Sequence, residues 1–347
     1  MRVAFDCERM KHPYTGLFEY CRQLGNALQT EKPHSADLLL YTRKESLPFF
    51  QKGISHIEQT SIHKLLFPSC KNIDIWHTTF QASAYIPGSR SLKKVLTVHD
   101  LNFLHEKESA TKRGICLKKH QQNLDKVDHI VTISEFAKQD ILTHLDTKGK
   151  PITVIYNGCT LKQYPDYVNP NYTSTAPFLF AIGTVNRKKN FHVLPCLLQG
   201  NNYNLVIAGT VDPQYKAQIL QEARRHGVED RVLVVGPISD EEKYWYLNNC
   251  KAFLFPSIAE GFGIPVIEAM KFGKPVFLSN KTSLPEIGGE HAYYFENFDP
   301  GHMQQVFTRG LTHYDTQHPA DKILAHSSKF DWLESARAYW QVYQSLA

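Results

Sequence analysis

Two glutamates and two glycines, gathered around one loop, are the residues whose types and spacing point most directly to chemistry. In the run 253–268, a short apolar stretch leads into Glu260, Gly261 and Gly263, and Glu268 follows in the first turns of an expected helix. Glycines let the backbone approach a ligand closely, and the N–H groups of a helix start favour an anion such as phosphate. Carboxylates beside such an anion must bind hydroxyls or stabilise positive charge. The alternative is a purely structural turn.

Three consecutive cations form a second group with a clear chemical use. Arg187, Lys188 and Lys189 follow an expected strand at 178–182 and open an expected helix. In that place they can hold a diphosphate between cationic side chains and backbone amides. The alternative, three solvated charges at a helix start, is disfavoured because cations there oppose the helix dipole.

Two single residues in the first half of the chain are further candidates. His99 ends an expected strand at 94–98, where it can face a ligand, and the alternative is a histidine satisfied within its own loop. Gly16 stands where an expected helix begins. It either lets that helix start approach a ligand or serves a simple turn. The residues by themselves leave both alternatives open.

These candidates need a scaffold that gathers strand ends, and the sequence has the pattern of one. Short apolar runs alternate with stretches of helical period in both halves of the chain, which is typical of parallel sheets covered by helices. Ligands bind beyond the carboxyl ends of such strands. The 347 residues exceed one typical core. We therefore expect an α/β protein with doubly wound domains at 1–166 and 178–328, a linker at 167–177, and a helix at 329–347.

Composition and charge narrow the classes of function. The seven cysteines are scattered and form no C-x-x-C pair, which argues against a disulfide framework or a zinc site. Residues 1–166 carry 23 Lys and Arg against 17 Asp and Glu, so this half could meet an anionic acceptor or an anionic membrane surface. Basic and aromatic residues are not interleaved as in RNA-binding motifs, so no nucleic-acid partner is expected. Without an apolar leader or an apolar run of about 20 residues, we expect a cytoplasmic protein, peripheral at most on the inner face of the cytoplasmic membrane.

Several segments together resemble one known family. The run Pro256–Met270 looks like the donor-site motif of glycosyltransferase family 4, whose members are retaining enzymes of the GT-B fold. Thr15-Gly16 is similar to the family's N-terminal glycine loop, and Thr97–Asp100 is similar to its active-site histidine strand. Gly183–Asn190 resembles its basic phosphate loop. The resemblance covers nearly the full length of the chain.

The resemblance implies two Rossmann-like domains that face a cleft, with the helix at 329–347 crossing back to the first domain. It also implies roles for individual residues. His99 and Glu260 would be catalytic, with Glu260 at the donor sugar. Glu268 would bind the ribose, and Lys189 would bind phosphate. The family's second cation often lies near the strand end, where this chain has Thr184. The nucleotide-sugar-binding residues that the resemblance implies are Gly16, Arg187, Lys188, Lys189, Gly261, Phe262, Gly263, Ile264, Val266 and Glu268.

The implied activity is the transfer of a hexose from a nucleotide sugar to a glycan or lipid-linked acceptor in cell-surface polysaccharide or lipopolysaccharide synthesis. Mannose from GDP-mannose is the first expectation, and UDP-hexoses are the other donors. No Asp-x-Asp motif occurs, and cations beside a helix start can replace a metal, so neither a metal nor a cofactor is expected. Two alternatives stay open: a nucleotide-sugar epimerase of the same fold, and a non-catalytic nucleotide-binding module.

Overall fold

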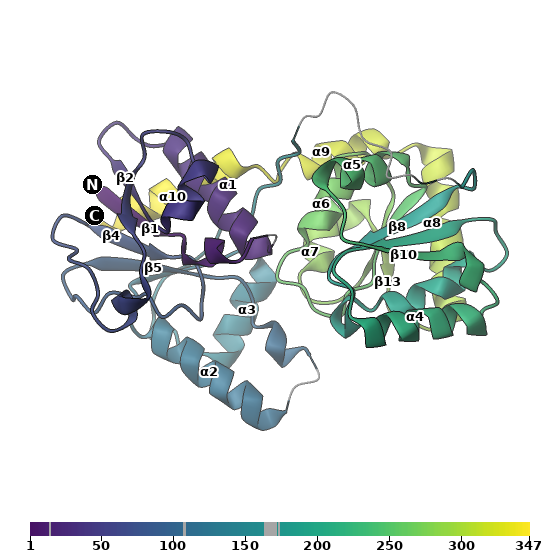
Figure 1. Ribbon diagram of the computed structural model, residues 1–347, viewed down its shortest axis with the longest axis horizontal. Helices are drawn as coiled ribbons and strands as arrows, with labels where there is room; N and C mark the ends of the chain where they lie inside the picture. The colour runs from purple at the N-terminus through teal and green to yellow at the C-terminus, as the bar shows by residue number, and fades with distance from the viewer. Residues whose placement is uncertain (14, 107–108, 163–171, 173) are drawn as a thin grey trace. The chain divides into compact units, whose positions relative to one another are not determined.

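The computed structural model describes residues 1–13, 15–106, 109–162, 172 and 174–347, which form two compact units (Figure 1). Unit 1 contains Met1–Thr160 together with Phe330–Ala347, and unit 2 contains Leu161–Lys329. Most of the expected linker at 167–177 lies outside the described residues. The chain leaves unit 1 after Thr160, somewhat before that expected linker, and returns to unit 1 at Phe330.

Unit 1 is built on a sheet of seven parallel strands in the order β3-β2-β1-β4-β5-β6-β7. The strands are β1 (Arg2–Asp6), β2 (Asp37–Thr42), β3 (Ser55–Glu58), β4 (Ile75–Thr78), β5 (Lys93–Val98), β6 (His129–Thr132) and β7 (Ile152–Val154). Most of these strands are buried along nearly their whole length, as strands of a parallel sheet covered by helices must be. The edge strand β3 was not expected from the sequence, because its residues Ser-His-Ile-Glu are largely exposed and lack an apolar run.

The main helices of unit 1 begin at side chains that satisfy their free N–H groups. They are α1 (Gly16–Thr30), α2 (Ala110–Leu124), α3 (Glu135–His144) and α10 (Trp332–Leu346). The side chains of Thr15, Ser109 and Ser134 each accept a hydrogen bond from a backbone N–H in the first turn of α1, α2 and α3. Such a cap stabilises a helix by about 1 kcal/mol, so the sequence marks these three starts sharply.

The C-terminal helix α10 lies beside α1 and is tied to unit 1 by buried hydrogen bonds (Figure 1). The Tyr339 hydroxyl lies 2.7 Å from that of Tyr20 and 3.0 Å from that of Thr97. The Tyr343 hydroxyl lies 2.6 Å from Nδ1 of His77. Because buried polar groups are costly without partners, these contacts fix α10 against the sheet.

Unit 2 has the same design with six parallel strands in the order β10-β9-β8-β11-β12-β13. The strands are β8 (Phe178–Ile182), β9 (Asn204–Ala208), β10 (Val232–Gly236), β11 (Ala252–Phe255), β12 (Val276–Ser279) and β13 (Tyr293–Phe295). The α-helices are α4 (Pro213–Arg225), α5 (Asp240–Asn249), α6 (Ile264–Met270), α7 (Leu284–Gly288), α8 (Pro300–Gln317) and α9 (Ala320–Ser327). The expected helix at 191–198 is a 3-10 helix, and Pro195 within it removes a hydrogen-bond donor.

The core of unit 2 lies between its sheet and the helices that cover it. Leu179, Ile207 and Phe277 come from three strands, and they share one apolar cluster with Ile219 of α4 and Phe307 of α8. Both units are therefore doubly wound α/β structures, which confirms the expected fold class.

Candidate functional site

The strand order of unit 2 changes direction between β8 and β11, which are neighbours in the sheet although they are distant in sequence. In open α/β sheets the connections from two such strands run to opposite sides, and the crevice between them is the usual ligand site. The loop 183–190 follows β8, and the loop 256–263 follows β11. These loops carry the cations and the Gly-x-Gly motif, so the fold brings together the two groups singled out in the sequence.

Lys189 and Glu260 meet at this point as an ion pair. The Lys189 Nζ lies 2.6 Å from Oε1 of Glu260, although the residues are 71 positions apart. Their side chains are 15% and 12% exposed, so the pair is largely withdrawn from water but still accessible. The Ser257 hydroxyl donates to the same Oε1 at 2.5 Å, and the Lys189 ammonium lies 4.6 Å from the centre of the Phe255 ring. A cation and a carboxylate are thus held side by side at the carboxyl end of the sheet.

The backbone around Glu260 is held by residues that follow β12. The Glu260 N–H donates to Oγ1 of Thr282 at 2.9 Å. The Ser283 hydroxyl is within bonding distance of the Glu260 carbonyl at 3.0 Å and the Phe262 carbonyl at 3.1 Å. Sequence reasoning gave Thr282 and Ser283 no role, because nothing in the sequence showed that the β12 loop packs against the β11 loop.

Of the two glycines in the motif, Gly263 has a backbone conformation that requires glycine. Its φ is +114°, a region that side chains with a Cβ rarely adopt, and it caps the start of α6. The Val266 N–H donates to the Gly263 carbonyl at 2.9 Å, so that amide is already satisfied within the loop. The helix begins at Ile264, one residue before Pro265.

Two glycines at strand ends make room for Lys189. A Cβ on Gly183 would lie 2.9 Å from Cε of Lys189, and a Cβ on Gly209 would lie 2.0 Å from the Gly183 carbonyl oxygen. Real Cβ atoms do not approach other atoms so closely. The close contact between the β8 and β9 ends therefore depends on glycine at 209, and the place of the Lys189 side chain depends on the absence of a Cβ at 183.

The three cations of the phosphate loop have different places. Residues 187–189 form a single 3-10 turn, in which Lys189 N–H donates to the Asn186 side chain. This short turn replaces the helix start that was expected. Arg187 is exposed, whereas the Lys188 carbonyl accepts from the Ile258 N–H at 2.9 Å and so joins the two loops.

Glu268 has a partner that the sequence did not reveal. Its Oε1 lies 2.6 Å from Nζ of Lys243, and both side chains are largely buried. Burial alone would lower the pKa of Lys243, but the Glu268 carboxylate outweighs it and raises that pKa above its usual value. Lys243 follows three acidic residues at the start of α5, where a lysine is expected to be a solvated surface charge. Nothing in the sequence therefore indicated that it pairs with Glu268.

In unit 1, His99 is a buried, neutral residue just beyond β5. Burial lowers its pKa. Its Nε2 lies 2.8 Å from the Thr79 carbonyl oxygen, and its ring packs edge-on against Tyr20 with centroids 4.6 Å apart. A carbonyl can only accept, so Nε2 carries the hydrogen and Nδ1 is the nitrogen able to accept a hydrogen bond. Gly16 is exposed at the first position of α1, and a Cβ there would meet no atom within 4 Å.

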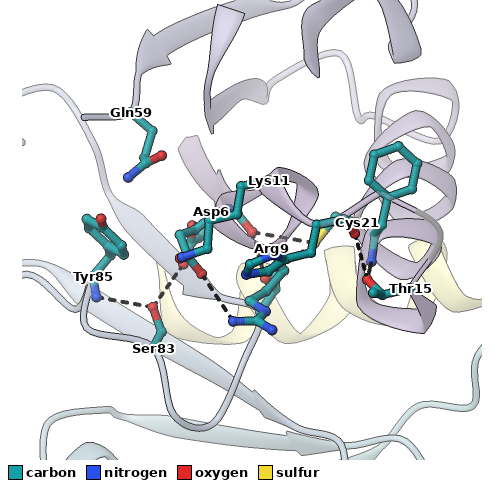
Figure 2. Close-up of polar contacts among 12 residues, drawn as sticks. Asp6, Arg9, Lys11, Thr15, Cys21, Gln59, Ser83 and Tyr85 are labelled. Atoms are coloured by element: carbon teal, nitrogen blue, oxygen red, sulfur yellow. Dashed lines mark hydrogen bonds and ion pairs between the residues drawn. The ribbon is translucent and has the colours of Figure 1, made fainter. Parts of the chain in front are cut away.

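A buried acid lies at the corresponding switch point of unit 1, between β1 and β4 (Figure 2). Asp6 accepts from the Glu8 N–H at 2.9 Å and from the Ser83 hydroxyl at 3.4 Å. Burial raises the pKa of Asp6 to about 8. Glu8 forms an ion pair with Lys11 in the turn that follows. Sequence reasoning missed Asp6, although its place at the end of an expected strand matches that of His99.

The segment Trp76–Thr78 at the end of β4 is structural. All three side chains are fully buried. Nε2 of His77 lies 2.8 Å from the Thr97 hydroxyl, and burial lowers the pKa of His77 to about 3. The ring is therefore neutral at physiological pH and serves to hold α10 on the sheet.

Comparisons with known proteins agree with this geometry. The family model described as "Glycosyltransferase Family 4" matches residues 16–163, and the model described as "Glycosyl transferases group 1" matches residues 169–318. Together the two models cover most of both units.

Curated relatives and a solved structure point the same way. The chain is 29% identical over 269 residues to the serotype-specific mannosyltransferase WbdA of Escherichia coli, which covers 70% of this chain and 32% of that protein. The chain thus spans about a third of the length of that relative. It is 24% identical to the O-antigen chain mannosyltransferase B of Escherichia coli, with 96% of each chain covered. Sucrose-phosphate synthase from Thermosynechococcus elongatus shares the fold, with a TM-score of 0.77 at 19% identity over 100% of this chain and 99% of that chain.

The ion pair at the switch point, the two family models and the mannosyltransferase relatives agree with one another. They favour an enzyme that transfers sugars over an epimerase or a non-catalytic module. The chain belongs to the glycosyltransferases, with a family 4 first half and a group 1 second half, and its fold is GT-B.

Proposed function

We propose that this protein is a retaining, metal-independent hexosyltransferase that transfers mannose from GDP-mannose to a glycan or lipid-linked acceptor. The observation that carries the proposal is the Lys189–Glu260 pair, with Nζ and Oε1 2.6 Å apart at the switch point of unit 2. A nucleotide sugar has an anionic diphosphate directly beside a hydroxyl-rich sugar. A cation can bind the diphosphate while the neighbouring carboxylate accepts hydrogen bonds from the sugar hydroxyls.

In this proposal the donor replaces the ion pair between Lys189 and Glu260 and makes its own contacts with each of the two side chains. Lys189 turns to the diphosphate, with Lys188 or Arg187 as the second cation, and stabilises the negative charge of the departing nucleotide, as a metal would elsewhere. Glu260 binds the sugar hydroxyls and stabilises the positive charge that develops on the sugar ring. Glu268, held by Lys243 at 2.6 Å, binds the ribose.

Unit 1 supplies the acceptor side of the proposed reaction. His99 is neutral because burial lowers its pKa, and its Nδ1 can accept a hydrogen bond from a sugar or acceptor hydroxyl. The relatives named for O-antigen and serotype-specific mannosyl transfer support mannose and a surface glycan. Within the described ranges, none of the helices combines the length and apolar character that crossing a bilayer requires. We place the enzyme in the cytoplasm, with peripheral contact to the anionic membrane face where lipid-linked acceptors lie.

The test is a binding and turnover series in the presence of EDTA. GDP and GDP-mannose should raise the thermal midpoint more than UDP and UDP-glucose, because a ligand at about 100 times its Kd adds roughly 2.7 kcal/mol. With octyl mannoside as acceptor probe, GDP release should be accompanied by a product whose anomeric configuration, read by NMR, is that of the donor. Normal turnover by the double variant Lys189→Ala, Glu260→Ala would contradict the site, and an absolute need for Mg²⁺ would contradict the metal-free mechanism.

A further inference from the structure

The turn between β3 and β4 of unit 1 presents large aliphatic side chains to solvent. We call residues 59–73 the leucine turn. Within it Ile62 is 62% exposed, Leu65 is 93% exposed and Leu66 is 73% exposed. Single exposed apolar residues are ordinary on protein surfaces. Three within five positions form a cluster, and clusters mark interaction sites.

The leucine turn is attached to unit 1 by contacts on its inner side. Nδ1 of His63 lies 2.9 Å from the Tyr41 hydroxyl. The Phe67 ring packs against Trp76 with centroids 4.9 Å apart. The N–H groups of Leu65 and Leu66 both donate to the Ile62 carbonyl at 2.9 Å. His63 and Phe67 therefore pin the inner side of the turn. Leu65 and Leu66 lie between these two anchors in the sequence, and Ile62 directly precedes the first.

The charged residues of the leucine turn indicate which kind of partner its apolar side chains contact. Its Lys64 and Lys71 are exposed, and residues 59–73 include no Asp or Glu. The acids at its two ends have partners outside the turn: Glu58 pairs with Lys44, and Asp74 accepts from the Arg2 N–H. An apolar tip flanked by cations is the chemistry that contacts an anionic bilayer, where aliphatic groups enter the acyl boundary and cations meet the headgroups. Leu142 of α3, another exposed apolar side chain of unit 1, stands alone in a helix that carries Glu135 and Asp140.

A second copy of the chain fits this surface less well. A stable protein interface buries roughly 800 Å² on each partner, which is far more than three side chains provide. A symmetric dimer through the turn would also bring Lys64 and Lys71 toward their own copies. A bilayer needs only a shallow, apolar, positively charged contact.

We propose that the leucine turn is the element of this enzyme that docks on the anionic membrane, with Ile62, Leu65 and Leu66 entering the interface and Lys64 and Lys71 contacting headgroups. This rests on the proposed function, because a lipid-linked acceptor is what makes such docking useful. The leucine turn is distinct from the residues assigned to donor binding.

Vesicle co-sedimentation of the full chain tests this proposal. The wild type should bind phosphatidylcholine vesicles that contain phosphatidylglycerol more tightly than vesicles of phosphatidylcholine alone. Leu65→Ser combined with Leu66→Ser should weaken binding about tenfold or more, because two buried leucines are lost. Lys64→Glu combined with Lys71→Glu should remove the preference for the anionic vesicles. Leu142→Ser, a change of a 50% exposed leucine in the same unit, is the matched control and should bind as the wild type does.

Three results would overturn the docking proposal. They are absence of binding by the wild type, unchanged binding by the double serine variant, and conversion of a wild-type dimer to a monomer by that variant in light scattering. GDP release with octyl mannoside, which needs no membrane, should be unchanged in the double serine variant. Loss of vesicle binding with retained release separates docking from catalysis. Failure of the wild type to release GDP would reject the proposed function without touching the vesicle result.

Discussion

The switch points of the two units share one topology and differ in chemistry. In unit 2 the loops after β8 and β11 hold Lys189 and Glu260 as a partly accessible ion pair. In unit 1 the loops after β1 and β4 hold Asp6, which is 1% exposed and bonded to a backbone N–H and to Ser83. Parallel sheets of this kind produce the same crevice each time. The side chains at the strand ends then decide what each switch point contains, which is an ion pair in unit 2 and a buried carboxyl group in unit 1.

The carboxyl groups of Glu260 and Asp6 also differ in how their charge is balanced by neighbouring groups. The carboxylate of Glu260 has an ammonium and a hydroxyl beside it, so its charge is matched within the site. The pKa of Asp6 is instead raised to about 8 by burial, which makes its neutral form the stable one near neutral pH. A charged pair at the surface of a crevice is suited to binding a charged ligand. A neutral buried acid is suited to fixing the backbone that precedes α1.

Removing the exchangeable charge of unit 2 should have the largest effect. Lys189→Met keeps most of the side-chain volume but leaves Glu260 without its ammonium partner and the donor without a cation. We expect kcat/KM for GDP release to fall about 10²- to 10³-fold, the usual cost of losing a group that stabilises developing charge. Steady-state kinetics measure this loss. Lys251→Met is the control, because Lys251 pairs with Asp315 on the surface at 2.8 Å and should leave turnover unchanged.

Replacing the buried Asp6 of unit 1 by asparagine should change the free energy of unfolding by an amount that depends on pH. The folded-state pKa of Asp6 lies above its ordinary value of 3.8, so the unfolded chain loses this proton first as the pH rises from about 4 to about 8. Over that window Asp6 costs stability. Asp6→Asn should therefore gain free energy of unfolding relative to wild type as pH rises, by roughly 1–3 kcal/mol near pH 8.

Urea denaturation at several pH values measures the Asp6 effect. Asp37→Asn, which removes an exposed carboxylate at the start of β2, is the control for the same substitution at the surface. A constant difference between Asp6→Asn and wild type would mean that the buried acid is ionised in the folded protein. The contrast between the two switch points would then be smaller than proposed.

Gly16→Ala should have the smallest effect and would test the start of α1. A Cβ at Gly16 meets no atom within 4 Å, so the free energy of unfolding should change by less than about 1 kcal/mol. If a ligand approaches this helix start, KM should rise about tenfold while stability is kept. Gly114→Ala, inside α2 and equally unobstructed, is the control and should leave KM unchanged. An unchanged KM in both variants would make Gly16 part of a simple turn.

The sequence predicted the strands and loops of the site better than it predicted their contacts. The β8 strand matched its expected bounds, and the motif loop followed β11 as expected. The contact between Lys189 and Glu260 depends on β8 and β11 lying side by side, and strand order is a property of the whole sheet. The Lys243–Glu268 pair escaped prediction for the same reason, since it joins two helices that are distant in sequence.

Other differences have local causes. The strand β3 is too polar to show an apolar run, and α8 and α9 lie in a stretch that was left unassigned. The cations at 187–189 were expected to open a helix, but the structure has one 3-10 turn there. The argument from the helix dipole therefore does not apply to them. Their place is set by Asn186 and by the close approach of the β8 and β11 loops.

The return of the chain to unit 1 at Phe330 has a consequence for synthesis in the cell. The first 160 residues leave the ribosome long before α10, whose Tyr339, Trp340 and Tyr343 are buried against unit 1. Until α10 has been synthesised, the surface that it covers stays exposed in the nascent chain. Unit 2 is continuous in sequence and can complete its fold earlier. Unit 1 is therefore completed only after unit 2 has been made, and a change that disrupts α10 would damage a unit whose sheet is made much earlier.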